Sequence, residues 1–136
     1  MEAHFRIDMK TVHVAAAVIV RNGKILVTKR GYGAFKDFWE FPGGKIEDGE
    51  SPENAVVREI REELSTDIAA EKSLGIVEYD YPDFHLIMEC FLCSIVSGEI
   101  TLLEHKDAKW LLQSELSTLT FLPADVYVLK LIADVL

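Results

Sequence analysis

Short alternating runs of apolar and polar residues predict a domain built largely from β-strands. The β-branched segments Thr11–Arg21 and Lys24–Lys29 flank Asn22-Gly23, a pair that is typical of the type I′ turn of a hairpin. Further strands are expected at Trp39–Phe41, Lys72–Tyr81, Phe84–Val96, Glu99–Leu103 and Ala108–Leu112, with Pro42-Gly43-Gly44 ending the first of these.

Two segments carry the apolar spacing of an amphipathic helix. Ser51 is a favourable N-cap and Pro52 suits the first helical position, so the first helix is expected to run from there to about Leu64. Its apolar stripe consists of Ala55, Val56, Ile60 and Leu64. The second helix is expected over Ala124–Val135, with a buried side made of Val126, Leu129, Ile132 and Ala133. Together these elements predict one α+β domain over residues 1–136, a mixed β-sheet covered by two helices.

The composition limits the classes of protein to which the chain can belong. The 136 residues are 49% hydrophobic and 27% charged, which suits one folded domain with a sizeable core. The net charge of −9 argues against a nucleic-acid polymer as partner. No apolar run reaches the ~18–20 residues that span a bilayer. The N-terminal MEAHFRIDMK also lacks an apolar signal-peptide core, so a cytoplasmic protein without membrane contact is expected.

Charge is divided unevenly along the chain. Residues 1–36 contain seven Lys and Arg against two Asp and Glu, a balance of +5, whereas the remaining hundred residues have a balance of −14. A chain divided in this way is suited to handling both cations and anions.

The two cysteines, Cys90 and Cys93, form a single CxxC within a predicted strand. An offset of three residues places them on opposite faces of that strand. They are therefore expected to pack in the core rather than to act as a redox pair or as metal ligands.

Three glutamates gather near the end of the first predicted helix. Glu59, Glu62 and Glu63 are spaced i, i+3 and i+4, which places their carboxylates on one side of the helix. Like charges at this spacing repel one another, and the helix dipole disfavours anions in the last turn. Two interpretations are open: a solvated charged surface, or a site for a hard divalent cation that leaves positions for water and phosphate.

The segment that contains these glutamates, GKIEDGESPENAVVREIREEL, resembles the Nudix hydrolase signature Gx5Ex7REUxEExGU, in which U is a bulky apolar residue. The matching positions are Gly44, Glu50, Arg58, Glu59, Ile60, Glu62 and Glu63. The chain departs from the signature at Ser65, where the family has glycine, and at Thr66, where it has an aliphatic residue. Serine in the left-handed conformation expected there would cost about 1 kcal/mol, or the helix ends differently.

Four further stretches are similar to the MutT-like branch of this family: WEFPGGKIE, YPDFH, EHKDAKW and LPAD. The resemblance implies an α/β/α sandwich with a mixed sheet, and hydrolysis of a (deoxy)nucleoside triphosphate to the monophosphate and pyrophosphate. It implies Mg²⁺ as cofactor, with Mn²⁺ as a substitute. The implied metal ligands are the backbone carbonyl of Gly43 and the carboxylates of Glu59, Glu62, Glu63 and Glu104. The general base is Glu59, Glu62 or Glu104, and supporting roles fall to Gly44, Glu50 and Arg58.

Candidate substrate contacts come from outside the helix. By resemblance Arg30 contacts the substrate. Lys45, beside the glycines, is placed to meet phosphate, and the alternative for each is a surface charge. Tyr81 and Phe84 could stack on a base or belong to the core. Asp125 would suit a base with an amino group, such as cytosine N4, because an ionised carboxylate only accepts hydrogen bonds. Its other interpretation is an acid stabilised by the helix dipole. The expected substrates are (d)CTP or a modified, for example oxidised, (d)NTP.

Two alternatives stay open. ADP-ribose or a dinucleotide could be the substrate, because Pro82 lies where a proline sometimes marks such enzymes in this family, although a hairpin turn explains it equally well. A non-catalytic nucleotide-binding module is the alternative of another class, but the loss of glutamates that would mark it is absent. The partner is thus expected to be a small nucleotide, and the chain a monomer or a homodimer.

Overall fold

The computed structural model describes residues 9–136, so most of the N-terminal stretch MEAHFRIDMK lies outside the described residues. The strands are β1 (Lys10–Arg21), β2 (Lys24–Lys29), β3 (Trp39–Glu40), β4 (Gly43–Lys45), β5 (Asp67–Asp80), β6 (Phe84–Ser97) and β7 (Asp107–Leu111). The helices are α2 (Pro52–Leu64), the 3-10 helix η1 (Gln113–Thr118) and α3 (Pro123–Val135). Within this part of the chain, no helix is long and apolar enough to cross a membrane.

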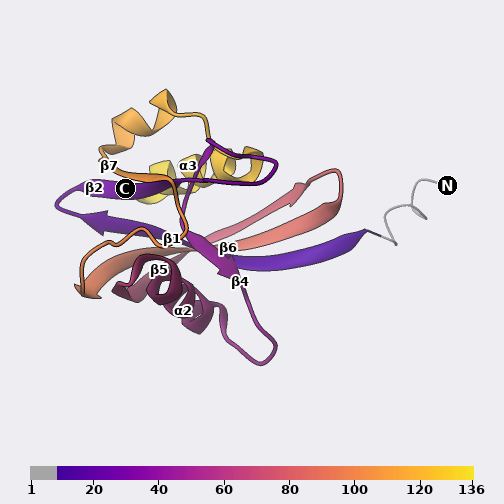
Figure 1. Cartoon of the computed structure of the whole chain (residues 1–136), viewed down its shortest axis with the longest axis horizontal. Coiled ribbons are helices and arrows are strands. Elements are labelled where there is room, and N and C mark those ends of the chain that lie inside the picture. The colour runs from indigo at the N-terminus through magenta and orange to yellow at the C-terminus, as the bar shows by residue number, and fades with distance from the viewer. Residues whose placement is uncertain (1–8) are drawn as a thin grey trace.

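A mixed sheet forms the centre of the fold, as expected (Figure 1). β1 runs parallel to β6, with Lys10 opposite Phe84, and its other pairings are antiparallel. Two strands share the second edge of β1: β4 pairs with its middle and β2 with its end. Between these stretches, Ala17 donates its N–H to the carbonyl of Pro42. Because β4 leads into the loop before α2, this pairing places the start of the signature segment at the centre of the sheet.

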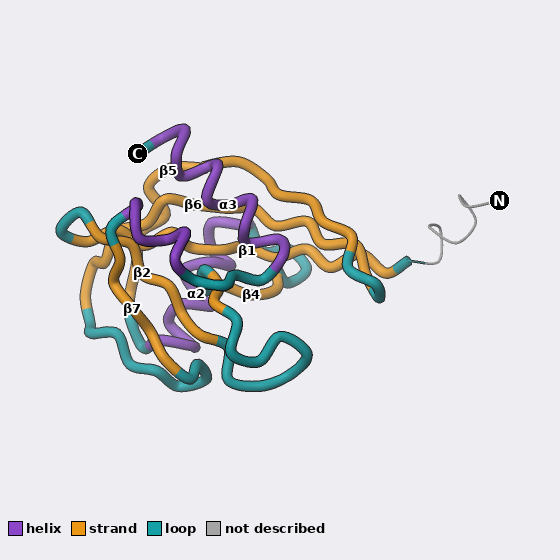
Figure 2. Tube along the Cα trace, turned by 90° about the horizontal axis from the view of Figure 1, so that it is seen from above, coloured by secondary structure: helices purple, strands orange, loops and turns teal. Residues whose placement is uncertain are grey.

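The two main helices cover opposite faces of the sheet, which gives the expected α/β/α sandwich (Figures 1 and 2). Successive residues of β1 point alternately into two cores: Ala15 and Ala17 pack with α2, whereas Ala16 and Val18 pack with α3. The predicted α2 stripe is fully buried; it consists of Ala55, Val56, Ile60 and Leu64. Each core also contains one of the two buried cysteines, so their predicted placement on opposite faces is confirmed.

Some predicted strands are wrong in detail. No strand forms over residues 99–103, because the N–H groups of Thr101 and Leu103 are used by the carbonyls of Leu64 and Glu63 at the end of α2. The glycine stretch does not simply end β3, since its last two residues begin β4. β5 also starts five residues before the predicted Lys72.

The buried side of α3 differs from the prediction as well. Its buried residues are Ala124, Asp125, Val128 and Ile132. Val126 and Ala133 face solvent instead, and Leu129 is half-buried. Asp125 lies on this buried side, and its side chain accepts a hydrogen bond from the N–H of Phe41, just after β3.

The end of α2 shows how the chain accommodates its two departures from the signature. Ser65 has φ 53° and ψ 36°, the left-handed conformation, and its N–H donates to the carbonyl of Arg61. Thr66 is 1% exposed, and its hydroxyl lies within hydrogen-bond distance of the carbonyls of Leu64 and Glu99. The helix therefore ends as it would with glycine, and the buried hydroxyl is satisfied.

We expect Ser65→Gly to stabilise the protein by about 0.5–1 kcal/mol, because glycine enters the left-handed region without the penalty of a Cβ atom. The free energy of unfolding from urea titrations measures the change. Ser73→Gly is the matched control, since Ser73 lies in β5 without a positive φ and glycine weakens a strand. A loss of stability in both variants would contradict this explanation of the helix end.

Candidate active site

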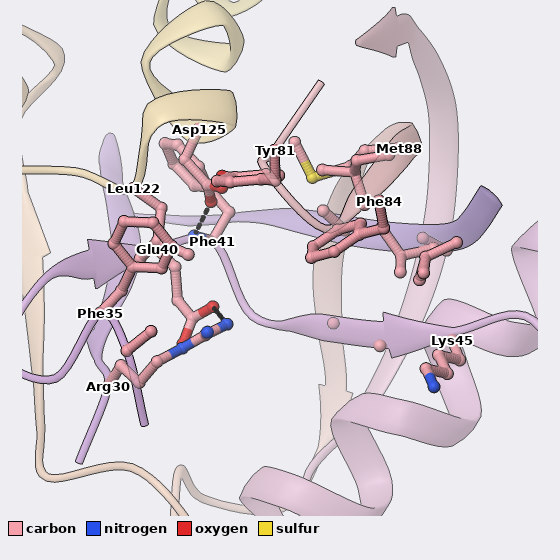
Figure 3. A pocket seen from close by; sticks show the side chains of 18 of the residues that line it. Arg30, Phe35, Glu40, Phe41, Lys45, Tyr81, Phe84, Met88, Leu122 and Asp125 are labelled. Carbon is pink, nitrogen blue, oxygen red and sulfur yellow. Dashed lines mark hydrogen bonds and ion pairs between the residues drawn. The ribbon is translucent and has the colours of Figure 1, made fainter. Parts of the chain in front are cut away.

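A cavity of about 460 Å³ lies between β1, the segment after β3, the β5–β6 turn and the start of α3 (Figure 3). All the predicted substrate residues line it, namely Arg30, Lys45, Tyr81, Phe84 and Asp125. Lining residues that the sequence reasoning missed include Phe35, Glu40, Phe41, Met88 and Leu122. Gly43 and Gly44 also line the cavity, so it extends from α3 to the start of the signature segment.

Asp125 lines this cavity from the first turn of α3 and is only 5% exposed. Its Oδ2 accepts a hydrogen bond of 2.9 Å from the backbone N–H of Phe41. Burial, opposed by this hydrogen bond, raises the pKa of Asp125 to about 7. Near neutral pH the side chain is therefore divided between an acid, which can donate, and a carboxylate, which only accepts.

Backbone contacts fix the start of α3 next to β3. Trp39 donates its N–H to the carbonyl of Thr120, and its own carbonyl accepts from the N–H of Leu122. The hydroxyl of Tyr81 accepts from the N–H of Ala124 at 3.1 Å. Tyr81 thus holds α3 in place besides lining the cavity.

Aromatic rings form one wall of the cavity. Tyr81 and Phe84 are stacked, with centroids 5.1 Å apart and ring planes at 26°. Phe35, from the loop over residues 31–38, meets Tyr81 edge-on with centroids 5.6 Å apart. An apolar wall of aromatic rings suits a planar aromatic ligand.

Arg30 is paired within the cavity. Its Nη2 donates to Oε1 of Glu40 at 2.9 Å, and its Nε donates to Oε2 at 3.3 Å. In Figure 3 the two side chains face each other below Asp125. In the sequence, Glu40 was only part of the stretch WEFPGGKIE, and nothing local indicated its partner. The pairing orients the guanidinium and offsets its charge inside the cavity.

Arg58 organises the carboxylates beside the cavity. Its Nε and Nη2 donate to Glu50 at 2.8 and 2.9 Å, and its Nη1 reaches Glu59 at 2.9 Å and Glu62 at 3.2 Å. It also donates to the carbonyl of Lys45 at 2.9 Å. Hydrogen bonding to Glu50 is the main reason why the pKa of Arg58 is raised. One guanidinium thus connects β4, the loop before α2 and α2 itself.

Glu63 lies outside this set of ion pairs. Its Oε2 is buried and has no hydrogen-bond partner. Burial, followed by the charges of Glu59, Glu104 and Glu40, raises the pKa of Glu63 to about 9. In residues 9–136, no group of three His, Cys, Asp or Glu side chains is already arranged to hold a metal ion. The donor set nevertheless consists of the hard oxygen atoms that Mg²⁺ takes, and a divalent cation would relieve the repulsion at Glu63.

Two glycines let the signature segment approach its neighbours. A Cβ atom on Gly43 would collide with the backbone of Ala15 in β1, and one on Gly44 would collide with the carboxyl group of Glu59. Neither glycine has a positive φ, so close approach rather than conformational freedom requires them. Gly44 therefore lies directly against one of the predicted metal ligands.

Comparisons with known proteins agree with this architecture. Residues 11–132 match the NUDIX domain. An 8-oxo-dGTP diphosphatase of Escherichia coli (strain K12) is 35% identical over 119 residues, which cover 86% of this chain and 92% of that protein. A CTP pyrophosphohydrolase of the same organism is 33% identical over 135 residues, covering 90% and 91%. The crystal structure of a MutT NUDIX hydrolase from Burkholderia pseudomallei is 30% identical, covers 90% of this chain and 98% of that chain, and has a TM-score of 0.79.

The fold is a mixed sheet between two helices, and an acidic helix lies beside an apolar cavity. Together with these relatives, the fold and the cavity identify the protein as a hydrolase that acts on the phosphoanhydride bonds of nucleotides. The chain belongs to the NUDIX domain family. The expected family, fold and class of enzyme are thereby confirmed.

We expect Asp125→Asn to raise the free energy of unfolding more at high pH than at low pH. The ordinary pKa of 3.8 applies to the unfolded chain, whereas the folded value is about 7, so the folded protein binds more protons between these values. This group therefore lowers the free energy of unfolding of the wild type as pH rises from about 4 to about 7, by up to about 4 kcal/mol. Asparagine still accepts from the N–H of Phe41 but does not titrate.

Urea titrations of both proteins at pH 5 and pH 8 measure this difference. Asp134→Asn, an exposed position on the same helix, is the matched control. An advantage of the Asp125 variant that is equal at both pH values would contradict the role of burial.

Proposed function

We propose that the protein hydrolyses a (deoxy)nucleoside triphosphate to the monophosphate and pyrophosphate in the presence of Mg²⁺, with (d)CTP or an oxidised (d)NTP as substrate. The observation that carries this proposal is the cavity that extends from Asp125 and its aromatic wall to Gly43, Gly44 and Lys45 beside the acidic helix. A nucleobase suits the aromatic end, and a polyphosphate with its cation suits the other. Relatives named 8-oxo-dGTP diphosphatase and CTP pyrophosphohydrolase support the substrate class.

In this proposal the cation is held by the backbone carbonyl of Gly43 and by the carboxylates of Glu59, Glu62, Glu63 and Glu104. The unpartnered Oε2 of Glu63 supports the assignment. When bound, Mg²⁺ or Mn²⁺ supplies neutralisation of phosphate oxygens and activation of a water molecule. The protein keeps its carboxylates together through Arg58, and Lys45 meets the phosphates. Glu59, Glu62 or Glu104 accepts the proton of the attacking water.

Asp125 selects the base. As a carboxylate it accepts a hydrogen bond from an exocyclic amino group such as cytosine N4, and as an acid it donates to a keto oxygen such as those of oxidised guanine. A pKa near 7 makes both forms available at neutral pH. Both kinds of base named for the relatives, oxidised guanine and cytosine, are therefore candidates for this chain.

We expect pyrophosphate release from at least one nucleotide of a panel that contains CTP, dCTP, 8-oxo-dGTP and ADP-ribose, and only with Mg²⁺ or Mn²⁺ present. Glu62→Gln should lower kcat by about 100-fold or more, because it removes a charge that binds the cation. Glu53→Gln, an exposed acid in the first turn of α2, is the matched control and should leave kcat unchanged. Anion-exchange chromatography identifies the products.

Wild-type rates in Glu62→Gln, or no turnover of any nucleotide with metal present, would contradict the proposal. Nucleotide binding by calorimetry without product would instead favour the non-catalytic module. Release of AMP from ADP-ribose, with no product from triphosphates, would favour that alternative substrate.

The ratio of kcat/KM for dCTP to that for 8-oxo-dGTP should rise from pH 6 to pH 8. The reason is that Asp125 loses its proton in this range and becomes an acceptor only. The ratio cancels effects of pH that both substrates share, including those on the metal and the attacking water. Initial rates at low substrate concentration measure it, and Asp125→Asn should make the ratio independent of pH. A flat ratio in the wild type would show that Asp125 does not select the base.

A further inference from the structure

A largely buried histidine side chain lies between the two parts of the site. His105 belongs to the connection between β6 and β7, and its side chain is 9% exposed. On one side of it, Leu103 donates its N–H to the carbonyl of Glu63 at 3.2 Å. On the other side, Lys106 donates its N–H to the carbonyl of Lys29 at 2.9 Å. The backbone around His105 is therefore attached both to the end of α2 and to the end of β2.

The ring of His105 faces two carboxylates with one nitrogen atom. Its Nε2 lies 3.7 Å from Oε2 of Glu40 and 3.9 Å from Oε2 of Glu63. Both distances are longer than a hydrogen bond. Two buried side-chain atoms in the described part of the chain lack a hydrogen-bond partner: Nδ1 of His105 and Oε2 of Glu63. Both atoms belong to side chains of this contact: Nδ1 to the ring of His105, and Oε2 to the carboxyl group that its Nε2 faces.

The two carboxylates serve different parts of the site. Glu40 holds Arg30 in the cavity, whereas Glu63 belongs to the acidic side of α2. A single Nε2–H makes a hydrogen bond of good geometry to only one of them at a time. A shift of about 1 Å brings it within hydrogen-bond distance of either oxygen.

We propose that His105 is a positioning residue, whose Nε2–H donates to Glu63 and fixes the direction in which that carboxylate meets a divalent cation, with Glu40 as the alternate acceptor. The proposal rests on the proposed role of the acidic helix in cation binding. Because Glu40 also holds Arg30, the exchange of His105 between its two acceptors links the cation side of the site to the cavity.

Mn²⁺ binding to the nucleotide-free protein, followed by electron paramagnetic resonance, tests this role without any turnover. We expect His105→Leu to weaken Mn²⁺ binding by about 10-fold or more, as losses of groups that orient metal ligands do. His105→Gln should restore most of the affinity, because its amide nitrogen can donate from nearly the same place. His13→Leu removes an exposed imidazole that pairs with Glu89 outside the cavity, and it should leave Mn²⁺ affinity unchanged.

The outcomes separate this inference from the proposed function. Weaker Mn²⁺ binding in His105→Leu, with no nucleotide hydrolysed by the wild type, would uphold the positioning role and overturn the proposed function. Nucleotide hydrolysis with an unchanged Mn²⁺ affinity in His105→Leu would overturn the positioning role alone. A wild-type protein that binds no Mn²⁺ would overturn both.

Nitrogen-15 NMR of the histidine rings in the wild type needs no substitution. We expect His105 to be the Nε2–H tautomer, since Nε2 is the ring atom that faces both carboxylates. Its Nε2 proton should shift on addition of Mg²⁺, whereas the ring of His13 should not respond. An Nδ1–H tautomer, or a His105 ring that is insensitive to Mg²⁺, would overturn the proposal even where His105→Leu fails to fold.

Discussion

The crowding of carboxylates at the end of α2 is the constraint on which the site depends. Arg58 compensates Glu50, Glu59 and Glu62 at once, and its bond to the carbonyl of Lys45 attaches β4 to the helix. Arg58 does not compensate the charge of Glu63. The raised pKa of Glu63 means that this side chain stays protonated near neutral pH. The α/β/α frame thus keeps an uncompensated acidic position beside the cavity, where a cation can take the place of a proton.

Polar side chains that line the cavity already have hydrogen-bond partners within the protein before any ligand binds. Arg30 is held by Glu40, and Asp125 accepts from the backbone of Phe41. The hydroxyl of Tyr81 is likewise occupied by the start of α3. Such pre-arranged groups lose little freedom when a ligand binds, so recognition depends on the few donor and acceptor positions that remain.

The local periodicity of the sequence was sufficient to predict most of the order of helices and strands. It was also sufficient to predict one half of the candidate site, the group of carboxylates on α2. The 3.6-residue repeat alone places three carboxylates on one side of α2, those of Glu59, Glu62 and Glu63. The other half depends on contacts such as that of Asp125 with Phe41, which are 84 positions apart and leave no local pattern. The buried side of α3 includes this polar residue, which an apolar pattern does not mark. β4 was not predicted because its glycines have no side chains that could alternate between apolar and polar. Glycine is required at position 43 because of the close approach to β1, which only the structure shows.

The placement of the two cysteines has a practical consequence. Burial raises the pKa of both Cys90 and Cys93 to about 12, and the sheet lies between them, so neither is a reactive nucleophile and the two cannot join in a disulfide. A thiol introduced by Tyr32→Cys, at a residue that is 67% exposed in the loop that carries Phe35, would therefore be the one that reacts. A fluorophore attached there would report the arrival of a ligand at the aromatic wall while both native cysteines stay in place.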